Sequence, residues 1–318
     1  MRPNVFLPEE IASQGIKLLE ADCDLVAPWM TGSPVESAML EVADGVIVRL
    51  FKVGQAELDS ARRLKVIAKH GVGLDNIAVD VALAHGICVV NTPTANMNAV
   101  AEHTVALMLA LARQIVPAAL ATKQGHFNDR VRFQGVEASG STLGIVGLGR
   151  IGSRVAQIGE GLGMQILAYD PLVPPESCAP YVKRVRRLDD LLRAVDFLSL
   201  HVPFTPETHH LLDSERLALL KPNCRIVNTS RGAVIDEQAL VRALESGAIG
   251  GAALDVFEVE PLSANHPLCR APNTLLTPHI SSSTRESLEK MAVDAARGVL
   301  DVLAGRKPDY PVNAGAPG

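Results

Sequence analysis

Three spaced glycines in the middle of the chain limit its fold more than any other feature. The run Gly144-Ile-Val-Gly147-Leu-Gly149-Arg-Ile-Gly152 lies where an apolar, strand-like segment (142–146) gives way to a helix-like one (150–161). At such a junction the first glycine permits a tight turn, the second lets backbone approach a pyrophosphate, and the third allows close packing of helix on strand. The run is therefore typical of a parallel α/β sheet that binds a dinucleotide. The turn residues expected to hold it are Gly147, Gly149, Arg150, Ile151 and Gly152.

A second apolar segment (165–169) ends in Asp170, which follows Gly149 by 170 − 149 = 21 positions. A spacing of about 20 places a carboxylate on the ribose hydroxyls of the adenosine. The next basic residue is Lys183, so no cation in between would neutralise a 2′-phosphate. The sequence thus predicts NAD rather than NADP, and the alternative is a tight strand-to-helix connection without a nucleotide.

Length and composition narrow the class of protein. At 318 residues, 47% of them hydrophobic, the chain is long enough for two domains with cores of their own. A net charge of −5 without a basic block argues against nucleic-acid or anionic-membrane partners, and no apolar run approaches the length of a membrane span. Five dispersed cysteines lack metal-ligand spacing, which is typical of reduced thiols in the cytoplasm, and no metal is expected.

Short apolar runs alternate with helix-like stretches on both sides of the glycine run. This alternation predicts parallel sheets with helices on their faces. Besides the two strands named above, strands are expected over residues 4–7, 24–27, 46–50, 65–68, 87–91, 197–201, 225–229, 252–256 and 274–277. A helix over residues 100–113 is apolar around most of its circumference, so we expect it to be buried between domains or subunits.

Three loops after predicted strands carry charged residues that suit the reduction of an oxo acid. Arg231 offers a planar guanidinium that can hold a carboxylate and polarise an adjacent carbonyl. Glu260 lies in the second loop, over residues 254–261. His279 lies in the third and, when oriented by a carboxylate, can pass a proton to a carbonyl oxygen. Since ligands collect at the carboxyl ends of parallel strands, these three are the candidate catalytic residues. The alternative for each alone is a surface ion pair worth about 0 to 1 kcal/mol.

Further motifs extend along the chain. They are His70-Gly-Val-Gly-Leu-Asp-Asn76, Asn91-Thr-Pro-Thr-Ala-Asn96, His201-Val-Pro-Phe-Thr-Pro-Glu-Thr208, Ser230-Arg231-Gly232, Asp255-Val-Phe-Glu-Val-Glu-Pro261 and Pro278-His279. With the glycine run, they make the chain resemble, over nearly its whole length, the D-isomer-specific 2-hydroxyacid dehydrogenases. That family includes D-3-phosphoglycerate dehydrogenase and the hydroxypyruvate and glyoxylate reductases.

The resemblance implies an α/β fold with two doubly wound parallel-sheet domains. A flavodoxin-like substrate domain would comprise residues 1–98 plus 283–318, and an inserted Rossmann NAD-binding domain would comprise residues 99–282. It also implies a homodimer, to which the helix over residues 100–113 contributes.

The implied chemistry is hydride transfer between nicotinamide C4 and C2 of a 2-oxo or 2-hydroxy acid. Arg231 would bind the substrate carboxylate, and His279, paired with Glu260, would be the acid/base. Further residues implied are Val72, Gly73 and Asn96 on the substrate side, and His201, Pro203, Thr208, Thr229 and Asp255 on the cofactor side. For His201, a packed strand-end histidine is an open alternative.

The identity of the substrate stays open. A cationic set near the predicted substrate loops, namely Arg49, Lys52, Lys69 and His70, favours 3-phosphoglycerate and phosphohydroxypyruvate. If the lysines are merely solvated, hydroxypyruvate, glyoxylate or another small oxo acid is the alternative. An alternative of another class is an NAD-sensing corepressor, a binding protein on the same fold.

Two departures from the family pattern stand out. Ile280-Ser281-Ser282-Ser283-Thr284 replaces the frequent Ile-Gly-Gly-Ser-Thr, which would alter backbone freedom near the nicotinamide. Phe127 stands where relatives often have Trp, and we expect little consequence.

Overall fold

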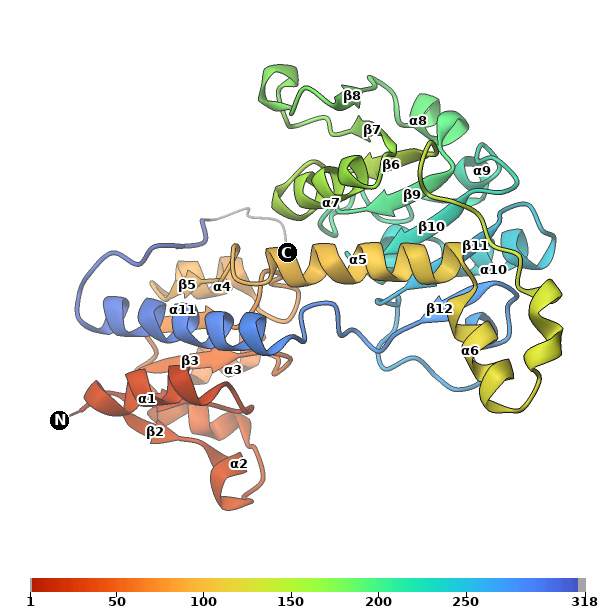
Figure 1. The fold of residues 1–318 in the computed structure, drawn as a ribbon. Helices are drawn as coiled ribbons and strands as arrows, with labels where there is room; N and C mark the ends of the chain where they lie inside the picture. Colours follow the sequence, from red (N-terminus) through yellow and green to blue (C-terminus); the bar gives the residue numbers. More distant parts are fainter. Residues whose placement is uncertain (1, 314–318) are drawn as a thin grey trace. The chain divides into compact units, whose positions relative to one another are not determined.

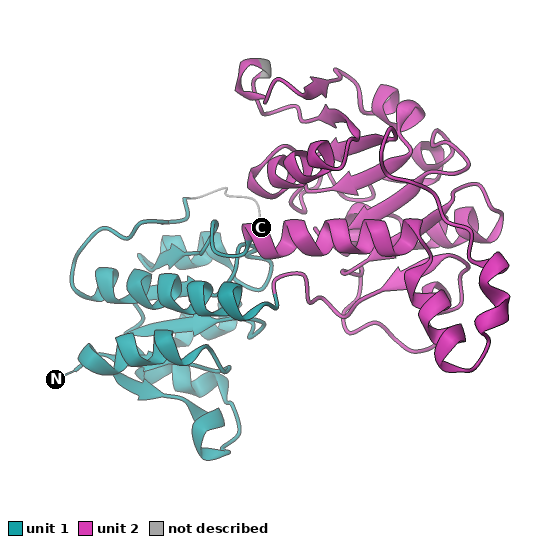
Figure 2. Cartoon of the chain, viewed as in Figure 1, with its two compact units in different colours: residues 1–96, 283–318 teal, residues 97–282 magenta. Residues whose placement is uncertain are grey.

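The computed structural model describes residues 2–313, which form two compact units (Figures 1 and 2). Unit 1 (teal in Figure 2) runs up to Asn96 and resumes at Ser283, and unit 2 (magenta) comprises Met97–Ser282. The sequence analysis puts the first crossing after Asn98. In the structure, residue 98 already lies in the first turn of the long helix α5 (Met97–Ala112), so the crossing comes after Asn96.

Unit 1 is built on a five-stranded parallel sheet. Its strands are β1 (Asn4–Phe6), β2 (Asp24–Val26), β3 (Gly45–Val48), β4 (Val66–Lys69) and β5 (Cys88–Val90). They are arranged in the order β2-β1-β3-β4-β5, and every pair is parallel. This is the flavodoxin-like order, whose topological switch point lies between β1 and β3.

Helices cover both faces of this sheet, each over its own apolar core. The helical segments are α1 (Ser13–Asp22), α2 (Pro28–Thr31), η1 (Ser37–Val42), α3 (Gln55–Ser60), α4 (Val79–Ala84) and α11 (Arg285–Leu303). On one face, α1 and α11 pack on each other and on strand residues such as Ile47 and Val66. On the other face, Val46 and Ile67 contact side chains of η1, α3 and α4. Alternate strand residues thus point to opposite cores, because side chains alternate along a strand.

Unit 2 contains a seven-stranded parallel sheet. Its strands are β6 (Thr142–Val146), β7 (Gln165–Tyr169), β8 (Val182–Arg184), β9 (Phe197–Leu200), β10 (Arg225–Asn228), β11 (Gly251–Leu254) and β12 (Thr274–Leu276). The order is β12-β11-β10-β9-β6-β7-β8, with the switch point between β6 and β9. The expected α/β class with two doubly wound parallel sheets is confirmed.

The helices of unit 2 also lie on both faces of its sheet. Those of eight or more residues are α5, α6 (Ile115–Lys123), α7 (Arg150–Gly161) and α10 (Glu237–Glu245), and shorter ones are α8 (Leu188–Ala194), α9 (Ser214–Leu217), η2 (Phe127–Arg132), η3 (Pro175–Ser177), η4 (Gly232–Val234) and η5 (Pro267–Cys269). Helices α5 and α7 cover one face, and α8, α9 and α10 cover the other.

The apolar helix of the sequence analysis is α5, and its buried side chains pack within unit 2 against α7, β10 and β11 (Figure 1). In the described part of the chain no single helix is long and apolar enough to cross a membrane. Helices α5 and α6 pass that test only when taken together, and they are bent by 65°.

Candidate active site

The three candidate catalytic residues follow three neighbouring strands of unit 2. Arg231 comes after β10, Glu260 after β11 and His279 after β12. These strands are adjacent and parallel, so their carboxyl ends lie at the same edge of the sheet. That edge is where ligands bind in open α/β sheets.

His279 and Glu260 are in direct contact. The Nδ1 of His279 lies 2.7 Å from a carboxylate oxygen of Glu260, whose other oxygen accepts the amide of Phe257 at 3.0 Å. Burial raises the pKa of Glu260, but the hydrogen bond and charge of His279 lower it more, so the pKa falls below its ordinary value. The carboxylate therefore stays ionised and holds a proton on Nδ1. The imidazole keeps 42% of its side-chain surface exposed, so Nε2 can exchange a proton with a ligand.

The backbone of His279 is itself unusual. Its φ is +52°, in the left-handed region that residues with a side chain rarely adopt. Such a conformation costs of order 1–3 kcal/mol and is found most often at functional sites. The strained turn after β12 is thus a second feature that marks His279.

Arg231 is half-buried and its loop is held by neighbours. The side-chain Nδ2 of Asn228 donates to the Arg231 carbonyl at 2.9 Å, and the Arg231 guanidinium donates to the Ser230 carbonyl at 2.7 Å. A side chain at Gly232 would lie 1.9 Å from the Phe257 carbonyl carbon, so only glycine fits there. This close approach places the loop of Arg231 against the loop that carries Glu260.

Asp255 is expected to contact a nicotinamide, but in the structure its side chain is fully buried. Its carboxylate accepts the Thr277 hydroxyl (2.6 Å) and the amides of Ile280 (2.9 Å) and Ser281 (2.8 Å). Burial raises its pKa, but the hydrogen bonds from His103, Thr277 and the two amides outweigh burial and lower it to about 2. Asp255 therefore presents no atom to a ligand and instead holds the segment around His279 in place.

His103 is a residue of this site that the sequence did not point to. Its Nε2 lies 3.3 Å from the Thr277 hydroxyl and 3.5 Å from Asp255. Since 152 positions separate His103 from Asp255 (255 − 103), no local pattern could have shown the contact.

The two serines in place of the frequent glycines fit the backbone without strain. Ser281 and Ser282 are not among the residues with positive φ, and the Ser281 amide donates to Asp255. Thr284 then accepts the Ser287 amide as the N-cap of α11. A side chain at these positions therefore needs no conformation reserved for glycine.

The glycine turn meets the steric demands of a dinucleotide site. Gly147 has φ +93°, and a side chain there would lie 2.5 Å from the His201 carbonyl oxygen. At Gly152 it would lie 2.0 Å from the Gly147 carbonyl oxygen, whereas at Gly149 it would meet nothing within 4 Å. Gly149 thus leaves open space at the N-terminus of α7, beside exposed Arg150 and half-buried Ile151. A phosphate bound there would meet free helix amides.

Asp170 and an adjoining hollow supply the rest of this site. The Asp170 carboxylate accepts the amides of Leu148 (2.7 Å), Leu172 (2.8 Å) and Val173 (3.1 Å). A carboxylate has about four acceptor positions, so one is left for a ribose hydroxyl. A hollow of about 150 Å³ lies beside it, lined by residues that include Leu148, Val173 and Tyr181. The residues present therefore fit a dinucleotide.

Arg184 is nearer to Asp170 than the sequence spacing indicates. It lies on the edge strand β8, which the sequence analysis missed, and donates to the carbonyl oxygens of Asp170 and Val173. Its guanidinium therefore stabilises the loop that follows β7. A cation does lie close to Asp170, contrary to the expectation from sequence distance alone.

Of the other expected cofactor residues, most use their side chains within the protein. The Thr208 hydroxyl donates to the Pro203 carbonyl at 2.7 Å, and the buried Thr229 hydroxyl lies 2.8 Å from that of Thr104. The Nε2 of His201 lies 2.8 Å from the Ser199 hydroxyl, and burial lowers the pKa of His201 to about 3. His201 is therefore neutral, as the packed strand-end alternative requires.

The expected substrate residues of unit 1 lie after β4 and β5. Asn91 donates to the Val72 carbonyl at 3.0 Å and thereby fixes the loop after β4. Within the described chain, the amides of Val72 and Gly73 have no acceptor, and both residues are half-buried. The Oδ1 of Asn96 is buried and has no partner among the same residues. Two amide donors and one amide acceptor are thus available to a ligand of unit 1.

The cationic set of the sequence analysis is smaller in the structure. Burial and the nearby charge of Arg49 lower the pKa of His70 to about 4, so His70 is neutral at neutral pH. The Lys69 ammonium donates to the Arg49 carbonyl and to Asn76 Oδ1, each at 2.5 Å. Arg49, Lys52 and Lys69 are still cations, but the ammonium of Lys69 is directed at these two oxygens, whereas Lys52 is exposed.

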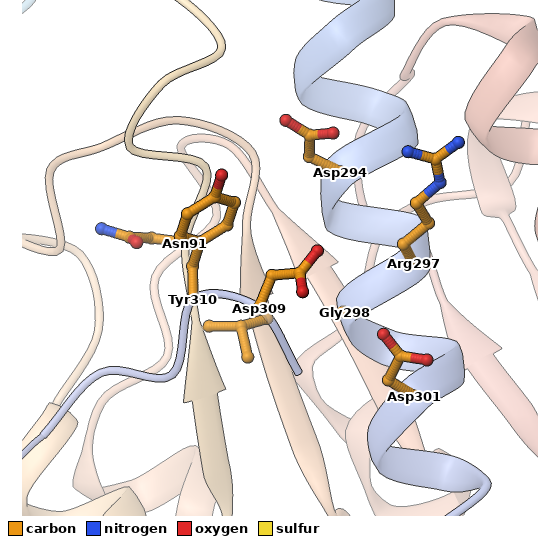
Figure 3. Close-up of a pocket in the computed structure, with 8 residues that line it drawn as sticks. Asn91, Asp294, Arg297, Gly298, Asp301, Asp309 and Tyr310 are labelled. Carbon is orange, nitrogen blue, oxygen red and sulfur yellow. The ribbon is translucent and has the colours of Figure 1, made fainter. Parts of the chain in front are cut away.

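The second hollow lies in unit 1, between α11 and the segment around Tyr310 (Figure 3). Its volume of about 20 Å³ suffices for one water but not for a substrate. Asp294, Asp301 and Asp309 line it, yet residues 2–313 contain no group of three His, Cys, Asp or Glu side chains placed to hold a metal.

Comparisons with known proteins agree on one family. Residues 105–281 match the family model described as D-isomer specific 2-hydroxyacid dehydrogenase, NAD binding domain. The D-3-phosphoglycerate dehydrogenase of Mycobacterium bovis is 42% identical over 316 residues, which are 98% of this chain and 59% of that protein. The chain therefore spans less than two thirds of the length of that relative.

Two further relatives are similar over their whole length. The glyoxylate reductase of Thermococcus litoralis is 39% identical over 98% of this chain and 97% of its own. The structure of an NADPH-dependent glyoxylate/hydroxypyruvate reductase from Sinorhizobium meliloti superposes with a TM-score of 0.88 at 29% identity, covering 98% of this chain and 97% of that one. The chain thus belongs to the D-isomer-specific 2-hydroxyacid dehydrogenase family, which binds NAD(P).

Proposed function

We propose that the protein is an NAD-dependent D-2-hydroxyacid dehydrogenase that interconverts a 2-oxo acid and a 2-hydroxy acid. The observation that carries this proposal is the 2.7 Å contact of His279 with Glu260, at the carboxyl edge of the sheet that bears the glycine turn. A proton donor and a guanidinium at one sheet edge are the groups that reduction of a 2-oxo acid needs. When bound, the nicotinamide supplies the hydride for C2, or accepts it in the reverse direction.

The chain's own residues would bind the acid and move the proton. Arg231 would hold the C1 carboxylate through its guanidinium. In unit 1, the amides of Val72 and Gly73 are the donors that we propose for an acidic ligand. Nε2 of His279 would give its proton to the C2 oxygen while Glu260 keeps the proton on Nδ1. The neutral imidazole would then regain a proton from solvent, since the side chain is 42% exposed. Oxidation of the hydroxy acid follows the same steps in reverse.

We propose NAD as the cofactor in preference to NADP. The carboxylate of Asp170 would repel a 2′-phosphate, and it keeps about one acceptor position for a ribose hydroxyl. Arg184 is engaged with two carbonyl oxygens, which favours its supporting the loop over binding a phosphate.

A homodimer is a further part of the proposal, with a changed location. Helix α5 is largely buried in unit 2, whereas α6 and η2 expose several large apolar side chains: Ile115, Val116, Leu120, Phe127 and Val131. Several exposed apolar side chains on two successive helices favour a protein partner, so we assign the interface to α6 and η2 instead of α5. Light scattering tests this assignment, and a monomer would contradict it.

The corepressor alternative and the enzyme are separated by turnover. The first experiment follows NADH oxidation with glyoxylate, hydroxypyruvate, phosphohydroxypyruvate and pyruvate, with NADPH as the matched cofactor control. Reduction of at least one acid, faster with NADH, is expected. Cofactor binding without turnover of any acid would favour the corepressor.

We propose a cytoplasmic location because the cysteines at 23, 88, 178, 224 and 269 are free thiols.

A further inference from the structure

The switch point of unit 1 lies between β1 and β3, and two loops meet there. Residues 7–10 follow β1 and residues 49–52 follow β3, at the carboxyl ends of two adjacent parallel strands. Flavodoxin-like sheets bind ligands at this position. The groups that these loops present therefore bear on what unit 1 can bind.

The carboxylate of Glu9 fills the anion-binding position of the β3 loop. It accepts three consecutive amides, those of Arg49 (2.6 Å), Leu50 (2.8 Å) and Phe51 (3.1 Å). Successive amides that converge in this way form a nest, which in other proteins binds phosphate. Here the nest already holds a carboxylate of the chain itself.

The neighbouring loop after β4 provides a contrast within the same sheet edge. The amides of Val72 and Gly73 have no acceptor among residues 2–313, whereas all three amides of the β3 loop are used by Glu9. Unit 1 therefore offers an open anion site after β4 and a closed one after β3.

The charged side chains of the two loops cancel, and the adjacent cation, Lys69, is directed at the Arg49 carbonyl and Asn76. Glu9 and Glu10 oppose Arg49 and Lys52, so the two loops carry no net charge. The Arg49 guanidinium donates to the Glu10 carbonyl at 3.0 Å. The charge of Arg49 lowers the pKa of His70, and the charge of Glu9 raises it. Leu50, which is 78% exposed, adds an apolar surface to the loop.

From this arrangement we infer that Glu9 determines specificity: it excludes a second anionic group and restricts the substrate to 2-oxo acids with an uncharged side chain. The inference rests on the proposed function and names the substrate class of the same site. It is opposite to the phosphorylated substrate favoured by the cationic residues of the sequence. A phosphate of about −2 charge would have to displace or face the Glu9 carboxylate.

The test compares two substrates that differ only by a phosphate. The ratio of kcat/KM for phosphohydroxypyruvate to that for hydroxypyruvate is measured for the wild type, Glu9→Gln and Glu10→Gln. The single oxygen of a glutamine at position 9 can still accept the Arg49 and Phe51 amides, as Oε2 of Glu9 does, but the side chain lacks the charge. Glu10→Gln removes an equal charge from the adjacent, exposed residue. We expect a wild-type ratio below one, a rise of about 10-fold in Glu9→Gln, and a change within about 2-fold in Glu10→Gln.

The outcomes separate this inference from the proposed function. A wild-type preference for phosphohydroxypyruvate, or an unchanged ratio in a folded Glu9→Gln variant, would overturn the inference while leaving the dehydrogenase intact. If Glu9→Gln does not fold, the wild-type ratio alone decides. Failure of the wild type to reduce any 2-oxo acid would overturn the proposed function and the inference together.

Discussion

The two units both expose the carboxyl edge of a parallel sheet, but they stabilise polar groups there in different ways. In unit 2 the polar groups are ionised and paired: Glu260 contacts His279, and buried Asp255 keeps its charge through a hydroxyl and two amides. In unit 1 the buried imidazole of His70 is neutral. The available donors of unit 1 are main-chain amides, and one set of them is closed by Glu9.

This difference separates chemistry from recognition. Proton transfer needs a positioned titratable group, and unit 2 provides one in His279, which is held by the carboxylate of Glu260. Main-chain amides cannot titrate, so unit 1 is suited to recognising the charge and shape of an acid. The comparison predicts that substitutions in unit 2 alter kcat and those at the edge of unit 1 alter selectivity.

The largest effect is expected for His279→Ala. Loss of the proton donor should lower kcat about 10³-fold with little change in NADH affinity, because general acid catalysis contributes 10²–10⁴-fold. Steady-state kinetics and a fluorescence titration with NADH measure the two quantities. His85→Ala, at an exposed histidine of unit 1, is the control and should stay within about 2-fold. Near-normal turnover in folded His279→Ala would remove the assigned chemistry from unit 2.

The neutral His70 should make unit 1 sensitive to mild acid. Its folded pKa of about 4 lies below the ordinary 6.5, so the unfolded chain binds the proton first as the pH falls. Stability that is complete above pH 6.5 is then lost down to pH 4, by roughly 3 kcal/mol. Urea unfolding followed by the single tryptophan, Trp29 of unit 1, reports the change. His70→Gln should flatten this dependence, and an equal slope in both proteins would contradict a neutral buried imidazole.

Glu260→Gln should lower kcat about 10²-fold, because the amide cannot stabilise the charged imidazole. The pKa of Glu260 lies below its ordinary value, so in the wild type this group stays ionised across the neutral range and limits the rate only in acid. The pH–rate profile of the variant should lose that acidic limb. Glu258→Gln is the matched control, since Glu258 contacts His210 and the Glu237 amide, and a change below about 3-fold is expected. Equal losses in both variants would indicate a general disturbance of the loop.

The smallest effect concerns the stability that Asp255 gives to unit 2. Its pKa of about 2 lies below the ordinary 3.8, so its contribution of roughly 2 kcal/mol is complete above about pH 4 and is lost as the pH falls toward 2. The difference in unfolding free energy between the wild type and Asp255→Asn should therefore shrink only in that range. Urea unfolding followed by circular dichroism measures it. A difference that shrinks between pH 6.5 and 4 instead would remove the contrast between the two units.

Local features of unit 2 could be predicted closely from the sequence. The strands 142–146 and 165–169 and the helix 150–161 have the bounds that the glycine run indicates, because tight turns and apolar runs act over a few neighbouring residues. The placement of Arg231, Glu260 and His279 after β10, β11 and β12 also follows from the sequence, since each directly follows a short apolar run.

Contacts between distant segments could not be predicted in this way. Glu9 is 40 positions from Arg49, and Arg184 is 14 from Asp170, on a strand too short and polar to be recognised. The burial that neutralises His70 and the hydrogen bonds that keep Asp255 ionised depend on side chains from several elements. The sequence shows which side chains can be charged but not how far each is desolvated, because desolvation depends on the groups packed around it.

By itself, then, the sequence determined the family, the α/β class and the residues able to carry charge at the ends of strands. The tertiary structure alone decided which of those charges persist and which amides remain open. The physical reason is the range of the interactions: backbone conformation and apolar patterning are local, whereas burial and ion pairing arise only when distant parts of the chain pack together.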